Sequence, residues 1–157
     1  MAFKITRNTK AKGAFLPLQD GAYTVTIKSF HLYDTEADAH DIDAIEDVNA
    51  QHEGTIILDT SKEGTPYMIV DIDGRQEFVW INNEKTLDFL TQDISTQLKV
   101  DSSLDFFEWC GVVVGSQVEM YVLTVEGTDK NTGNTVPYTN KTFRKPAMFD
   151  AIINGLT

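Results

Sequence analysis

The side chains that could carry catalysis are few and lie apart in the sequence. The chain has three histidines, His31, His40 and His52, and a single cysteine, Cys110. It contains no Gly-x-Ser-x-Gly, Walker, dinucleotide-binding or His-Glu-x-x-His pattern. Cys110 follows Trp109 in an apolar stretch, which favours a buried small hydrophobe over a nucleophile. We therefore expect no catalytic residue, no enzymatic activity and no cofactor.

A second group of side chains resembles the first half of a calcium-binding loop. Possible ligands alternate over Asp34, Glu36, Asp38 and His40. Position six of such a loop is normally glycine and position twelve glutamate, because they make the loop turn and clamp the ion. Here these positions hold Ala39 and Ile45. The pattern indicates loose surface binding of cations, and we expect no metal site.

Aromatic residues suggest binding rather than catalysis. Tyr67, Phe78 and Trp80 fall on two adjacent β-rich runs. Every nucleobase has a π-face, so exposed aromatic rings accept bases of any sequence, at roughly 1–3 kcal/mol per stacked base. The alternative is that these rings are ordinary core beneath residues 34–53 or beneath the following helix.

The last β-rich run repeats the combination of aromatic and basic residues. Lysine and arginine beside the rings would attract phosphate groups. The alternative for Tyr138 and Phe143 is normal cross-strand packing in a hairpin. The candidate nucleic-acid-binding residues are Tyr67, Phe78, Trp80, Arg75, Lys28, Tyr138, Lys141, Phe143, Arg144 and Lys145.

The elements that must position these residues begin with a hairpin. Residues 67–72 and 75–81 are separated by Asp73-Gly74, the pair favoured by a two-residue type I′ turn. Counting outward from this turn places Tyr67 opposite Trp80. One face of the hairpin is then aromatic, and the other is aliphatic, with Met68, Val70, Ile72, Val79 and Ile81.

Further strands and helices complete the expected domain. The alternation of residues 22–33 changes phase near Lys28-Ser29, which predicts a β-bulge. The other expected elements are strands at 54–59, 117–126 and 136–144, a main helix at about 84–99 and a C-terminal helix opened by Pro146. This order predicts a mainly β fold with helices (α+β), a small antiparallel barrel like the oligonucleotide-binding (OB) fold; the competing architecture is a β-sandwich.

Charge and composition limit the function classes. The 157 residues carry a formal net charge of -11, which excludes a polycation that coats duplex DNA. Basic residues without acids occupy 1–19 and 130–149, and acidic residues without Lys or Arg occupy 34–47. We expect a basic N-terminal arm (1–19) and a single domain (20–157) with an acidic insert at 34–53. The lone cysteine and the absence of a signal peptide or long apolar run predict a cytoplasmic protein without membrane contact.

Several short features resemble phage-encoded single-stranded-DNA-binding proteins with an OB fold. They are Asp20-Gly21-Ala22-Tyr23-Thr24-Val25, then Gly64-Thr65-Pro66-Tyr67 leading to Asp73-Gly74 and Trp80, then a helix, Val118 to Val125 and a basic hairpin. The resemblance covers about residues 15–145. The chain differs from the family in its acidic insert, and its last residues lack the acidic tail that such proteins use to recruit partners.

The resemblance and the aromatic runs lead to one functional expectation. We expect sequence-independent binding of single-stranded DNA in the host cytoplasm, in phage replication or recombination. Replication or recombination proteins and further copies of the chain are the other possible partners. The alternative is a virion structural, cargo or assembly protein that acts through protein–protein contacts. A third option is a host-interaction protein whose acidic face imitates nucleic acid.

Overall fold

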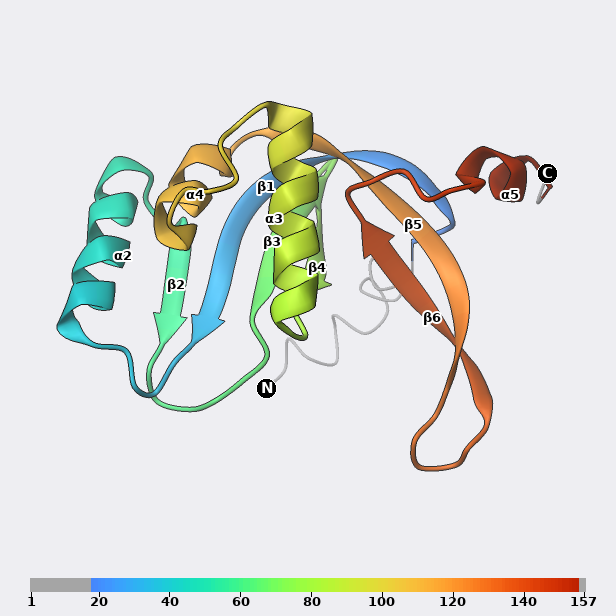
Figure 1. The fold of residues 1–157 in the computed structure, drawn as a ribbon, viewed down its shortest axis with the longest axis horizontal. Coiled ribbons are helices and arrows are strands. Elements are labelled where there is room, and N and C mark those ends of the chain that lie inside the picture. The colour runs from blue at the N-terminus through green and yellow to red at the C-terminus, as the bar shows by residue number, and fades with distance from the viewer. Residues whose placement is uncertain (1–17, 156–157) are drawn as a thin grey trace, which may run out of the picture.

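The structure is a computed structural model that describes residues 18–155. It has a mixed α+β fold in which one curled sheet forms a half-barrel, with helices packed around it (Figure 1). The strands are β1 (Gly21–Tyr33), β2 (Ile56–Asp59), β3 (Tyr67–Ile72), β4 (Arg75–Trp80), β5 (Gln117–Thr128) and β6 (Thr135–Thr142). The helices within this part of the chain are α2 (Ala39–Gln51), α3 (Glu84–Leu98), α4 (Phe106–Val113) and α5 (Phe149–Gly155).

The long strand β1 organises the sheet. The strand order is β4-β3-β1-β5-β6, and β2 pairs with β1 outside this path. The register between β1 and β3 shifts between Ile27 and Ser29, so Lys28 is the extra residue of a bulge. This bulge confirms the one expected from the phase change, and it lets β1 bend around the core.

The pairing of β2 corrects one expectation. We expected an antiparallel sheet, but β2 runs parallel to β1, with Phe30 opposite Ile56. The reason lies in the acidic insert, where α2 carries the chain back so that β2 starts beside β1 in the same direction. Asn49 on α2 fixes this arrangement, because its amide both donates to the carbonyl of Ile56 and accepts from the amide of Ile56.

The β3–β4 hairpin has the register that its turn predicts. Tyr67 lies opposite Trp80, and Met68 lies opposite Val79. Asp73 and Gly74 both have positive φ angles, 48° and 90°, as a type I′ turn requires. Alternating residues therefore point to opposite faces, and the aliphatic face of the hairpin lies in the core with Met68 fully buried.

Helix α3 confirms the predicted main helix and lies across the inner face of the sheet (Figure 1). The side chain of Asn83 caps its N-terminus by accepting from the amide of Thr86. Leu90 and Ile94 face the core, as their helical spacing predicts. The core also takes in Trp109 of α4, whose indole NH donates to the hydroxyl of Ser95 across 2.8 Å.

The two ends of the sheet, β4 and β6, approach each other as the sheet curls. The ammonium group of Lys141 on β6 donates a hydrogen bond to the carbonyl oxygen of Phe78 on β4, at 2.8 Å. We call this junction between β4 and β6 the seam. Beyond it, the distal part of the β5–β6 hairpin projects from the body (Figure 1). Within the described residues no helix combines the length and apolar character needed to cross a bilayer.

Candidate nucleic-acid interface

Four rings line up on the outer face of strands β1, β3 and β4. The rings of His31 and Tyr67 are parallel, with centroids 4.5 Å apart. Tyr67 also stacks on Phe78 at 4.8 Å and lies 5.0 Å from the tilted ring of Trp80. We call these four residues the aromatic face. They form one continuous row of contacting rings across three strands.

The aromatic face is open rather than sealed. Trp80 is 48% exposed and Phe78 is 39% exposed. Tyr67 and His31 are partly buried, largely because each ring covers its neighbour. The expectation that Tyr67, Phe78 and Trp80 lie together is therefore confirmed, and the alternative that they form core beneath residues 34–53 or α3 is wrong for Phe78 and Trp80.

His31 is a member of the aromatic face that sequence reasoning missed. The bulge at Lys28 turns Phe30 into the core and His31 to the outer face, directly opposite Tyr67. The phase change near Lys28 could have indicated which face His31 occupies. The pairing of β1 with β3, which brings the two rings together, could not be read from local pattern.

The aromatic face carries little charge near neutral pH. Burial lowers the pKa of His31 from its ordinary value of 6.5, so its ring is mainly neutral at pH 7. The ring nitrogen Nε2 of His31 lies 3.1 Å from the hydroxyl of Ser29. Burial, and then the neighbouring Tyr33, raises the pKa of Tyr67. Neutral rings suit stacking against the face of a base.

Two of the candidate cations lie on strands close to this face. Lys141 reaches the backbone of Phe78 across the seam, and burial lowers the pKa of its ammonium group, against the attraction of Glu77. Lys28 is exposed at the bulge of β1. Arg75 forms an ion pair with Glu77 at 2.9 Å, on the opposite side of β4 from Phe78 and Trp80.

The other candidate residues do not join the aromatic face. Arg144 pairs with Asp93 at 2.8 Å, and Lys145 pairs with Asp150 at 2.6 Å. Phe143 is only 4% exposed and belongs to the core, so its ring is not available for stacking. Tyr138 is exposed on the projecting hairpin, opposite Val125, and its ring lies over Gly127.

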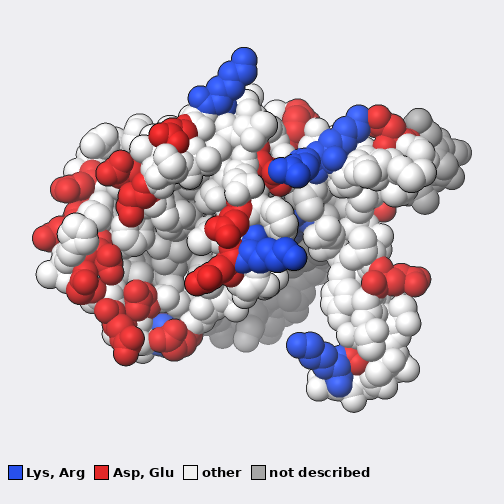
Figure 2. Space-filling model, in the orientation of Figure 1, with Lys and Arg blue, Asp and Glu red and all other residues white. Residues whose placement is uncertain are grey.

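The charge distribution separates acidic and aromatic regions. Acidic side chains gather over α2 and its surroundings, whereas the visible basic side chains are few and apart (Figure 2). Helix α2 packs against α4 through Ile45, which is buried, and Val48, which contacts Gly111. The acidic insert is thus a docked helix. Most of the expected basic arm, with Lys4, Arg7, Lys10 and Lys12, lies outside the described residues.

Reactive and metal-binding groups have structural roles. Burial raises the pKa of the Cys110 thiol well above its ordinary value, which suits a core residue. Asp34 accepts from the amide of Glu36, and Asp38 caps α2 by accepting from the amide of Asp41. In the described part of the chain, no three His, Cys, Asp or Glu side chains gather in a group that could hold a metal ion.

No family model, curated protein or solved structure is significantly similar to the chain.

Proposed function

We propose that the protein binds single-stranded DNA through the aromatic face, without enzymatic chemistry. The observation that carries this proposal is the row of rings from His31 to Trp80, in which Trp80 and Phe78 are 48% and 39% exposed. Solvent-exposed aromatic rings on adjacent strands are costly unless a ligand covers them. Bases of a single strand stack on such rings with little regard to sequence.

The topology supports the same proposal. If β2 is counted as part of the insert with α2, five strands remain, in the chain order β1, β3, β4, β5, β6. Helices α3 and α4 lie between the third and the fourth of these strands. An OB barrel is a partly open barrel of five strands that binds oligonucleotides on its second and third strands. Here those strands are β3 and β4, which carry Tyr67, Phe78 and Trp80. We therefore propose that the half-barrel is OB-like.

Stacking, rather than phosphate attraction, supplies most of the binding free energy in this proposal. Of the candidate cations, Arg75, Arg144 and Lys145 are each neutralised by a carboxylate. Lys28, which is exposed on β1, and Lys141, whose ammonium group lies at the carbonyl of Phe78, remain as candidates to meet phosphates. The net charge of -11 also opposes DNA at long range.

The two tryptophans make the proposal testable by fluorescence. Trp80 is exposed, whereas Trp109 is 1% exposed and fixed to Ser95. Titration with oligo-dT should quench the emission of the wild-type protein, because a stacked base contacts the Trp80 indole. The Trp80→Phe variant retains a ring and keeps Trp109 as an internal reference, and its emission should not respond.

The outcomes separate the proposal from its alternative. Saturable quenching that the Trp80→Phe change abolishes supports stacking of DNA on the aromatic face. No binding of oligo-dT by quenching or by anisotropy of a labelled strand overturns the proposal. If size-exclusion chromatography then shows self-association that Trp80→Phe weakens, the aromatic face is a protein interface, as an assembly protein would need.

A further inference from the structure

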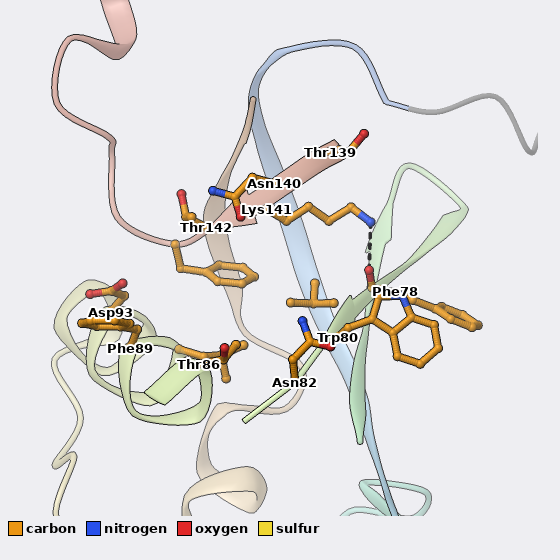
Figure 3. Close-up of a pocket in the computed structure, with 13 residues that line it drawn as sticks. Phe78, Trp80, Asn82, Thr86, Phe89, Asp93, Thr139, Asn140, Lys141 and Thr142 are labelled. Atoms are coloured by element: carbon orange, nitrogen blue, oxygen red, sulfur yellow. Dashed lines mark hydrogen bonds between the residues drawn. The ribbon is translucent and has the colours of Figure 1, made fainter. Parts of the chain in front are cut away.

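A cavity opens at the seam, beside the aromatic face. It has a volume of about 390 Å³ and lies between β4, β6 and α3. In Figure 3, Lys141 crosses the seam to the carbonyl of Phe78, with Asn82 and Thr86 on the other side of the cavity. The volume is at the lower end of the roughly 300–1,000 Å³ typical of small-ligand sites, so the cavity suits one small group.

Two side-chain amides at this cavity have no hydrogen-bond partner among residues 18–155. Asn82 follows β4, and Asn140 lies on β6, and both line the cavity (Figure 3). Neither side-chain amide makes a hydrogen bond to any residue that the structure describes. An asparagine amide offers two donors and one acceptor in a plane, and this pattern matches the hydrogen-bonding edge of a nucleobase.

The cavity is continuous with the aromatic face. Phe78 and Trp80 belong to that face and also line the cavity. Phe89 on α3, which is 49% exposed, supplies a further aromatic ring at the cavity. A strand that stacks on Trp80 would therefore pass the mouth of the cavity.

The cavity lining carries one negative and one positive side chain, Asp93 and Lys141, and the ammonium group of Lys141 is held by the carbonyl of Phe78. Asp93 contributes a carboxylate to the lining, and this carboxylate is only 9% exposed. Arg144 pairs with it from the outside. The lining therefore has no excess positive charge that would attract a phosphate, and a phosphate beside Asp93 would be repelled by its carboxylate, whereas a neutral base would not.

We propose that the seam cavity takes up one unstacked nucleobase from the bound strand and that Asn82 and Asn140 read its edge. This inference rests on the proposed function and adds a base-selective position to a binding surface that is otherwise indifferent to sequence. Adenine is the first base to test, because one asparagine amide can pair with its N6 and N7 atoms together.

The experiment compares oligo-dT strands that differ at one central position, which is thymine, adenine, guanine or cytosine. Binding of each strand is measured by anisotropy for the wild type and for the double variant Asn82→Ala, Asn140→Ala. Both residues are exposed, so the variant should fold. Gln92→Ala, on the same helix as Phe89 but outside the cavity lining, is the matched control for loss of an exposed amide.

We expect one central base to change the affinity of the wild type by at least about fivefold. The double variant should lose this preference while still binding oligo-dT within about threefold of wild type, and Gln92→Ala should keep the preference. If the wild type binds all four strands equally, or if the double variant keeps the preference, the base-reading cavity is wrong and stacking on the aromatic face stands. If no strand binds at all, both proposals fall.

Discussion

His31 on β1 and Tyr67 on β3 face each other as cross-strand neighbours, with ring planes only 7° apart. This pair extends the aromatic hairpin by one strand. Phe78 and Trp80 alone would form a short hydrophobic edge, whereas the stack of His31 on Tyr67 and of Tyr67 on Phe78 supports the two exposed rings, Phe78 and Trp80, on which bases can stack. The bulge at Lys28 is the cause, because it sets which β1 side chains face outward.

The aromatic face and the core should respond differently to truncation. We expect Trp80→Ala to weaken binding of oligo-dT about 5–150-fold, corresponding to roughly 1–3 kcal/mol per stacked base, with a stability loss of about 1 kcal/mol or less. Its neighbour Ile81 is 6% exposed, so Ile81→Ala should cost about 2–5 kcal/mol of unfolding free energy instead. Urea unfolding and anisotropy titrations measure the two effects. Equal losses of stability in both variants would contradict the division into face and core.

Stability should fall in acid partly through His31. Burial lowers the pKa of His31 in the folded protein, so between that lowered value and 6.5 the unfolded chain binds more protons than the folded one. This contribution is fully present above 6.5 and is lost as the pH falls through the window. His31→Phe keeps a ring on Tyr67 but cannot titrate, and its melting temperature should decline less than that of the wild type below pH 6.5. His40 and His52 are present in both proteins, so the comparison isolates the change at His31. If the melting temperatures of the two proteins decline in parallel as the pH falls, His31 does not contribute to the loss of stability in acid.

Binding should depend only weakly on salt. The sequence alone predicts three to five phosphate contacts and a log–log slope of about -2 to -4. Arg75, Arg144 and Lys145 are held in ion pairs, which leaves Lys28 and Lys141 of the candidate cations, and Lys62 lies over the ring of Tyr33, a neighbour of Tyr67, so we expect a slope of about -1 to -2. Lys28→Ala should make the slope shallower by about 0.7. A slope near -4 that Lys28→Ala leaves unchanged would mean that phosphates bind elsewhere, and removal of residues 2–17 would then test the basic arm.

The acidic helix α2 should slow association with DNA at low salt. Asp43, Glu46 and Asp47 are exposed, and replacing them with Asn, Gln and Asn removes three negative charges without disturbing Ile45. We expect faster association by stopped-flow fluorescence below about 50 mM salt, and no difference near 1 M, where the Debye length is about 3 Å. Deleting the insert is a poorer test, because Asn49 holds β2 through Ile56. An increase in the association rate that persists at high salt would instead indicate a direct contact between α2 and the DNA.

Local pattern predicted the elements of this fold better than their pairing. The Asp73-Gly74 turn fixes the register of its own hairpin, and the phase change at Lys28 locates the bulge, because both depend on residues near in sequence. The parallel pairing of β2 depends on how α2 docks on α4, and no short pattern encodes that contact.

In the candidate site too, contacts within one hairpin could be predicted, and contacts between distant segments could not. Tyr67, Phe78 and Trp80 could be placed together, since one hairpin carries them all. The ion-pair partners of the cations could not be predicted, because Arg144 pairs with Asp93, about fifty residues away in the chain. The burial of Phe143 in the core could not be predicted either. Sequence alternation alone does not distinguish the buried side of a strand at the edge of a curled sheet from its exposed side.

The central place of β1 has a consequence for how the chain folds. On one edge this strand pairs with β5 in its first half and with β2 in its second half. Gly21 and its partner Val122 are about one hundred residues apart, so during synthesis the first half of β1 waits for most of the chain to leave the ribosome. In the nascent protein, this hydrophobic edge of β1 therefore stays unpaired until late in synthesis. The yield in the cell should depend on translation speed and chaperones more than the final stability suggests.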